Sequence, residues 1–177
     1  MITIISGTNR IGSNSLNVAN SYSKMLQEVG LDCQVLDLSQ LPLTFMSEDM
    51  YGLRTNDTKA IIDKYILPVQ HFIFAIPEYN GTYPGALKLF MDAMEPKFFH
   101  HKSACLVGLA TGRAGNIRGL DAFTHVLHHL QMEVLSKKVL LSQVNMLLDE
   151  EGIINDLVSI KIIEEQISTS KRIQNLK

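Results

Sequence analysis

Short apolar segments alternate with longer amphipathic ones, and this alternation constrains the fold more than any other feature of the chain. We expect strands at about residues 2–6, 33–38, 72–76, 103–110 and 133–141. We expect helices at about residues 13–29, 57–67, 84–94 and 120–130, and a last helix from Glu150 onward. The segment 72–76 is apolar throughout, as in a strand buried on both faces. This order predicts an α/β fold, a five-stranded parallel sheet with helices on both faces.

Length and charge narrow the class of protein. A chain of 177 residues fits a single domain spanning residues 1–177. A formal net charge of −2 gives no reason to expect nucleic acid or an anionic membrane as partner. We see no segment that could span a bilayer and no signal-peptide pattern, and Cys33 and Cys105 lie in expected strands, as core residues do. We therefore expect a cytoplasmic protein.

The first turn has the composition of an anion site. Gly7 to Ser15 follow the first expected strand directly and lead into a helix. Free backbone N–H groups and the positive end of the helix dipole meet at such a point. Hydroxyls at Thr8, Ser13 and Ser15 add donors, and Arg10 adds charge. The turn has neither a P-loop ending nor the dinucleotide-binding glycine pattern, so it suggests a phosphate held by hydroxyls and amides; an ordinary turn capped by Ser13 is the alternative.

The second turn has an aromatic loop at the mouth of a buried strand. Tyr79 and Tyr83 flank Asn80-Gly81, a pair that tolerates positive φ. Such a loop can cover a planar ring, with Asn80 and neighbouring amides bonding to the ring edge. The alternative is a strand–helix loop whose tyrosines merely pack.

The third turn, residues 111–119, is rich in glycine and carries Arg113 and Arg118. Its glycines would let the backbone approach a ligand, although both arginines could instead be simply solvated. Each of the three turns follows a strand. Because the carboxyl ends of parallel strands meet at one edge of a sheet, we expect the three turns to gather there.

A histidine cluster has spacing that can bind a metal. His125, His128 and His129 lie at i, i+3 and i+4 of one expected helix. No thiolate or H-E-x-x-H arrangement accompanies them. We therefore expect a helix surface or a subunit contact rather than a metal site.

The three turns together resemble the NADPH-dependent FMN reductase family, which includes flavodoxin-like quinone, chromate and azo-dye reductases. The resemblance extends from residue 1 to about residue 145, and its most specific motif is residues 77–88. It implies a flavodoxin-like fold with bound FMN. It also implies hydride transfer from NADPH or NADH to a small electron acceptor by a ping-pong mechanism. Members are usually homodimers or homotetramers, with the flavin near the subunit interface.

By matching position, the resemblance implies that the first turn holds the FMN phosphate and that the other two line the isoalloxazine ring. One departure is that many members carry Asn where this chain has Ser15. No catalytic side chain is implied, because the flavin itself carries the chemistry. The implied cofactor-binding residues are Thr8, Arg10, Ser13, Asn14, Ser15, Pro77, Glu78, Tyr79, Asn80, Gly81, Thr111, Gly112 and Arg113.

Two other functions are compatible with the same turns. One is a flavodoxin-like electron carrier that binds FMN but does not oxidise NADPH. The other is a non-enzymatic module in which FMN supports folding or assembly. Carriers tend to be strongly acidic, so a net charge of −2 favours the reductase.

Overall fold

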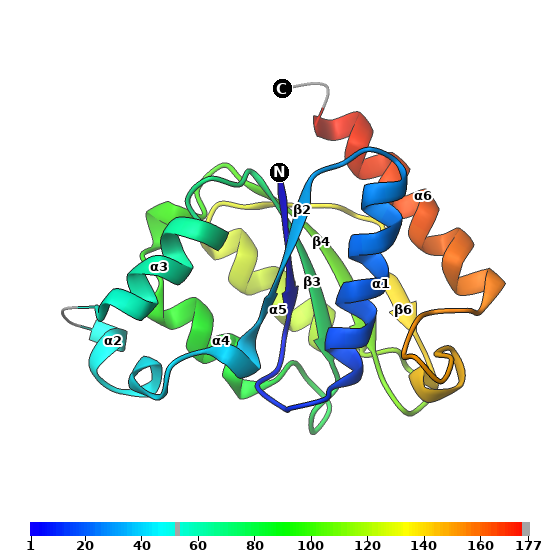
Figure 1. Cartoon of the computed structure of the whole chain (residues 1–177), viewed down its shortest axis with the longest axis horizontal. Helices are drawn as coiled ribbons and strands as arrows, with labels where there is room; N and C mark the ends of the chain where they lie inside the picture. The colour runs from blue at the N-terminus through cyan, green and yellow to red at the C-terminus, as the bar shows by residue number, and fades with distance from the viewer. Residues whose placement is uncertain (52–53, 175–177) are drawn as a thin grey trace.

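The computed structural model describes residues 1–51 and 54–174 and is built on one parallel sheet (Figure 1). Its strands run in the order β2-β1-β3-β4-β5. Both β5 and β6 pair with β4, β5 near the start of that strand and β6 near its end. This order is that of a flavodoxin-like doubly wound sheet, so the predicted fold class is confirmed. The strands are β1 (Ile2–Ser6), β2 (Cys33–Asp37), β3 (His71–Pro77), β4 (Ser103–Leu109), β5 (Glu133–Val134) and β6 (Val139–Leu141).

Helices cover both faces of the sheet (Figure 1). On one face lie α1 (Asn14–Glu28) and α6 (Leu157–Gln174), and on the other lie α3 (Asn56–Tyr65), α4 (Gly85–Ala93) and α5 (Ile117–His129). The short α2 (Glu48–Tyr51) lies in the connection from β2 to α3. Successive strand residues face opposite sides, so Ile4 packs with α1 and α6 while Ile5 packs with the other three helices. The sheet is therefore buried on both faces.

Local sequence signals set the ends of several helices. The Ser13 side chain accepts the N–H of Leu16 and caps α1. Gly30, at φ +74°, donates to the carbonyl of Gln27 and ends that helix as expected. Pro84 was expected at the first helical position of α4, but its ψ of 143° is extended and the helix begins one residue later.

The fifth strand differs from the prediction. One strand was expected over residues 133–141, but β5 and β6 are separate, with residues 135–138 between them. The Gln166 amide of α6 donates to the carbonyl of Leu106 at 3.1 Å and to that of Lys137 at 2.9 Å. The Gln166 side chain thus bonds to β4 and to the segment between β5 and β6, at the point where a continuous fifth strand would pair with β4.

The two last helices also begin elsewhere than expected. The final helix was expected from Glu150, but an antiparallel bridge between Leu148 and Ile154 precedes it and α6 begins at Leu157. Leu157, the first residue of this helix, is 80% exposed. The other helix, α5, begins at Ile117 rather than at residue 120. No helix within the described ranges is long and apolar enough to cross a membrane.

Candidate functional site

The turns that follow β1, β3 and β4 meet at one edge of the sheet, as expected, and enclose two adjoining cavities. The first measures about 440 Å³ and the second about 330 Å³. Glu78, Ala110 and Thr111 line both, so the two cavities adjoin one another. Their combined size suits a cofactor-sized ligand.

Two glycines shape the first turn. The N–H of Gly7 donates to the carbonyl of Ala75 at 2.9 Å, and a Cβ on Gly7 would lie 3.0 Å from that same oxygen. Gly12 has a φ of +64°, a conformation that glycine adopts at little cost. The chain therefore passes close to β3 and then turns sharply into α1.

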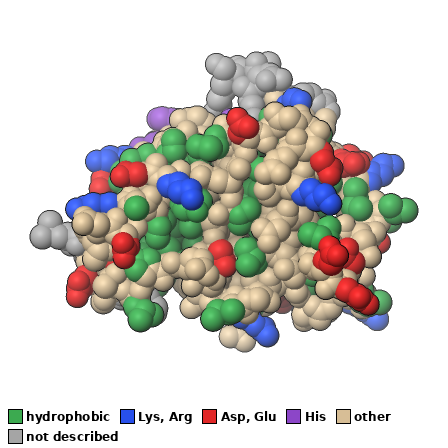
Figure 2. Space-filling model, viewed as in Figure 1, with side chains coloured by type: hydrophobic (Ala, Val, Ile, Leu, Met, Phe, Trp, Pro, Cys, Tyr) green, Lys and Arg blue, Asp and Glu red, His purple; other side chains and the backbone are tan. Residues whose placement is uncertain are grey.

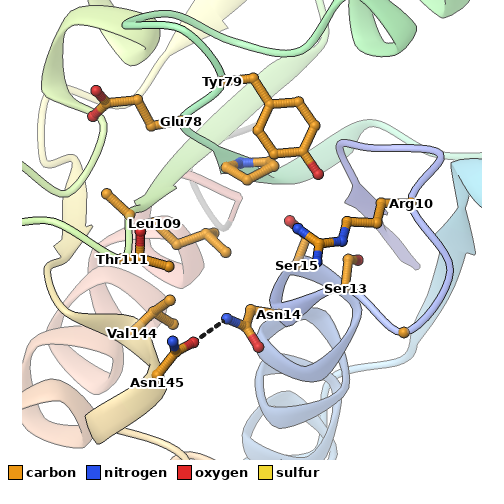
Figure 3. A pocket seen from close by; sticks show the side chains of 13 residues that line it. Arg10, Ser13, Asn14, Ser15, Glu78, Tyr79, Leu109, Thr111, Val144 and Asn145 are labelled. Atoms are coloured by element: carbon orange, nitrogen blue, oxygen red, sulfur yellow. Dashed lines mark hydrogen bonds between the residues drawn. The ribbon is translucent and has the colours of Figure 1, made fainter.

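The N-terminus of α1 is rich in hydrogen-bond donors. The first N–H groups of a helix have no acceptor within the helix itself, and Ser13, Asn14 and Ser15 all line the first cavity. The Ser15 hydroxyl is fully buried and has no partner among the described residues. The Ser13 oxygen accepts from Leu16, which leaves its hydroxyl proton able to donate. Figure 3 shows the Arg10 guanidinium beside Ser13 and Ser15. These groups make the end of the cavity suitable for an anion.

The second turn is a two-residue hairpin loop. Tyr79 and Thr82 exchange backbone hydrogen bonds of 2.9 and 3.2 Å, and Asn80 and Gly81 have φ values of 51° and 83°. Asn-Gly is the preferred pair for this type of turn. Both positive φ values agree with the conformation that the sequence predicted.

The two tyrosines of this loop have different roles. Tyr79 lines the first cavity (Figure 3), and its hydroxyl accepts a hydrogen bond of 3.0 Å from Thr8 Oγ1. Tyr83 packs against Phe123, with 5.3 Å between ring centroids. Tyr83 is thus a packing residue, whereas Tyr79 connects the first turn to the second.

The third turn is held by the segment that follows β6. The N–H of Gln143 donates to the carbonyl of Gly112 at 2.8 Å, and Ser142 Oγ donates to the carbonyl of Arg113 at 2.7 Å. Arg113 and Arg118 both line the second cavity and are exposed. This turn is therefore fixed through its backbone while its arginines face solvent.

The structure brings together all thirteen residues expected at the site. Twelve line one or both cavities, and Thr8 lines neither but bonds to Tyr79. Arg10, Ser13, Asn14, Ser15, Pro77 and Tyr79 line the first cavity, Asn80, Gly81, Gly112 and Arg113 line the second, and Glu78 and Thr111 line both.

A fourth segment, which the sequence did not lead us to predict, also lines the first cavity. Val144 and Asn145 line the first cavity, and Asn14 Nδ2 donates to Asn145 Oδ1 at 2.6 Å (Figure 3). No motif marks this segment. Its position just after β6 is a usable signal, because ligands in such sheets bind beyond the carboxyl ends of the strands.

The histidine cluster lies away from the cavities. His125, His128 and His129 are exposed on α5. Across residues 1–51 and 54–174, no group of three or more His, Cys, Asp or Glu side chains is arranged to hold a metal ion.

Comparisons with known proteins identify relatives of this chain. The profile of the NADPH-dependent FMN reductase family matches residues 1–145. An NAD(P)H-dependent FMN reductase of Pseudomonas aeruginosa is 29% identical over 165 residues, which are 88% of each chain.

Two solved structures show the same fold. A flavoenzyme NAD(P)H:acceptor oxidoreductase of Paracoccus denitrificans matches with a TM-score of 0.79 at 18% identity, over 95% of this chain and 93% of its own. A flavodoxin of Streptococcus pneumoniae matches with a TM-score of 0.57 at 15% identity, over 94% and 93%. Since the family profile covers most of the sequence, the chain belongs to the NADPH-dependent FMN reductase family of oxidoreductases.

Proposed function

We propose that the two adjoining cavities bind FMN and that the chain passes hydride from NADPH or NADH to a small acceptor. Suitable acceptors are a quinone, a free flavin, an azo dye or a metal oxyanion. The observation that carries the proposal is that a donor-rich helix N-terminus opens into the same cavity as an aromatic hairpin loop. An anion and a planar ring of one ligand would fit these two ends.

The donors at the first turn suit the phosphate of FMN. The buried Ser15 hydroxyl lacks a partner among the described residues, and a phosphate oxygen would supply one. Ser13 and the first N–H groups of α1 would donate alongside it, and Arg10 would balance the charge. Thr8 would support the site through Tyr79, and Asn14 would do so through its bond to Asn145.

The backbone of the other two turns suits the flavin ring. The N–H groups of Asn80, Gly81 and Gly112 donate no hydrogen bond to any residue that the structure describes. They would donate to the ring edge, where preorganised N–H groups stabilise developing negative charge. Pro77 and Glu78 would line the ring on the same side as Tyr79.

FMN, when bound, supplies the hydride chemistry, and the chain needs no nucleophile of its own. The residues around the cavities bind and orient the two substrates. We expect the nicotinamide and the acceptor to use one opening in turn, because the two cavities adjoin along shared lining residues. The kinetics should then be ping-pong, with parallel lines in a steady-state analysis of NADPH against a quinone. Intersecting lines would contradict a shared opening.

The first test is the visible absorption spectrum of the purified, desalted protein before and after anaerobic addition of NADPH. Flavin bands that bleach with NADPH would support the reductase. Bands that resist NADPH but bleach with dithionite would favour an electron carrier or a structural flavin. A colourless protein that also fails to bind added FMN would refute the proposal.

The distribution of surface charge helps to distinguish a reductase from a flavodoxin-like electron carrier. Figure 2 shows acidic and basic side chains interspersed over the visible face. A carrier that docks on partner reductases through charge would instead present a field of one sign. This pattern and the net charge of −2 favour direct use of NADPH.

We further propose that residues 1–177 form one domain and that the protein acts in the cytoplasm as a homodimer or homotetramer. Family resemblance supports the assembly, and the two cysteines, both free, agree with a reducing compartment. Sedimentation equilibrium would distinguish monomer, dimer and tetramer.

A further inference from the structure

Asn116 is fully buried and connects the third turn to the end of β3 without lining either cavity. It precedes α5 with a φ of +63°, and its Nδ2 donates to the carbonyl of Ile76 at 2.9 Å. Ile76 lies immediately before the second turn, whereas Asn116 lies within the third. One amide therefore joins the strand end of β3 to the start of α5.

The residues around the Asn116 side chain pack closely against it and against the adjoining loop. A Cβ on Gly119 would lie 2.1 Å from Asn116 Oδ1, and 2.8 Å from both Cγ and Nδ2 of the same side chain. A Cβ on Gly108 would lie 2.1 Å from the carbonyl oxygen of Gly115, at the neighbouring position of the loop. Two glycines thus allow the third turn and the Asn116 side chain to pack against the sheet.

Only one of the two polar atoms of the Asn116 amide is hydrogen-bonded to a described residue. Asn116 Oδ1 is buried without a hydrogen-bond partner among the described residues, a situation that disfavours a buried polar group. Glycine would adopt the same φ without that penalty. The bond to Ile76 is the feature that a glycine would lack.

A second bond lies close by. The N–H of Glu78, in the second turn, donates to the carbonyl of Leu109, the last residue of β4, at 2.9 Å. The Asn116 bond adds a contact at a different point, between the end of β3 and the residue before α5.

We propose that Asn116 is a positioning residue that fixes the loops 77–83 and 110–116 relative to each other. Their N–H groups then face a planar ring at a set separation. The part of this inference that concerns the ring rests on the proposed function, whereas the coupling of the loops does not. The test below treats the two parts separately.

Two substitutions should disturb this bond by different routes. Asn116→Gly removes the amide while keeping the backbone conformation. Gly119→Ala inserts a methyl group where the amide lies and should displace it. Combining them places the methyl group in the space that the amide has left, so the second change should then have little further effect. Gln166→Met is the control, since it also removes a buried amide that donates to backbone carbonyls but lies outside both cavities.

The first readout is amide hydrogen exchange in the flavin-free protein. In Asn116→Gly and in Gly119→Ala, exchange should rise by about tenfold at the hydrogen-bonded amides of Glu78, Tyr79 and Thr82 together with that of Ala110, because local opening becomes easier. Gln166→Met should leave both loops at the wild-type rate even where it lowers the melting temperature. Faster exchange in residues 110–116 alone, or in neither loop, would overturn the coupling.

The second readout is the FMN dissociation constant from flavin fluorescence. Each single variant should bind FMN about tenfold more weakly, the double variant should equal Asn116→Gly, and Gln166→Met should match wild type. If Gly119→Ala weakened binding by the same factor in both backgrounds, the methyl group would act independently of Asn116 and the inference would be wrong. A wild-type protein that bound no FMN would refute the proposed function, while the exchange data would still decide the coupling.

Discussion

Replacing Ser13 by alanine should separate the structural role of this residue from its proposed role in binding. Its side chain caps α1 by accepting the N–H of Leu16 at 3.3 Å, and it also lines the first cavity. Loss of a cap costs about 1 kcal/mol, which lowers the melting temperature of a chain of this size by about 2–4 °C. Loss of a hydrogen bond to a charged phosphate costs about 1.5–3 kcal/mol, which weakens binding by about 10- to 100-fold.

Thr55 provides a matched control for this prediction. It caps α3 in the same way, with 3.4 Å between Thr58 N and its Oγ1, and it also donates to Asp49. Thr55→Ala should therefore lower the melting temperature at least as much as Ser13→Ala. It should leave FMN affinity unchanged, because Thr55 lines neither cavity of the site.

The assay is a flavin fluorescence titration with FMN and with riboflavin, alongside thermal melting of the flavin-free proteins. Ser13→Ala should weaken FMN binding and leave riboflavin binding unchanged, since riboflavin carries no phosphate. An FMN affinity equal to wild type would show that the phosphate does not bind at this helix N-terminus. Equal losses for both ligands would show that the substitution acts through the fold.

Two further predictions concern stability and thiol chemistry. Gly108→Ala should destabilise the protein by about 3 kcal/mol or more in urea unfolding, because its Cβ would lie 2.1 Å from the carbonyl oxygen of Gly115. Gly85→Ala, with no atom within 4 Å of its Cβ, should be neutral or stabilise by up to about 1 kcal/mol, and equal effects would contradict this packing. Burial raises the pKa of the Cys105 thiol to about 11, so at pH 8 about one such thiol in a thousand is ionised. A disulfide reagent at that pH should therefore modify the half-buried Cys33 quickly and Cys105 only after unfolding, and rapid modification of both would refute this assignment.

Local chemistry explains the parts of the fold that could be predicted. Ser13 and Gly30 cap a helix through bonds within a few residues of themselves, so their types suffice. Asn80 and Gly81 adopt positive φ values for an equally local reason. The apolar run near residue 74 signals burial on both faces without reference to any partner.

One error arises where a distant segment decides the outcome, and another where a local signal was available. The break between β5 and β6 coincides with bonds from Gln166, which lies on another helix. A local signal was available for the start of α6, because the Asp156 side chain accepts from the N–H of Ser159, as a cap does.

The candidate site shows the same distinction between local signals and contacts made by distant segments. Residue types and the alternation of strands and helices were enough to predict the chemical groups of the three turns and the edge of the sheet at which they meet. Three contacts could be seen only in the folded chain: Asn145 joins the wall of the cavity, Tyr83 packs against the core and Asn116 bonds to Ile76. Turn chemistry depends on a few neighbouring residues, whereas these contacts link positions between 40 and 131 residues apart, which only the folded chain brings together.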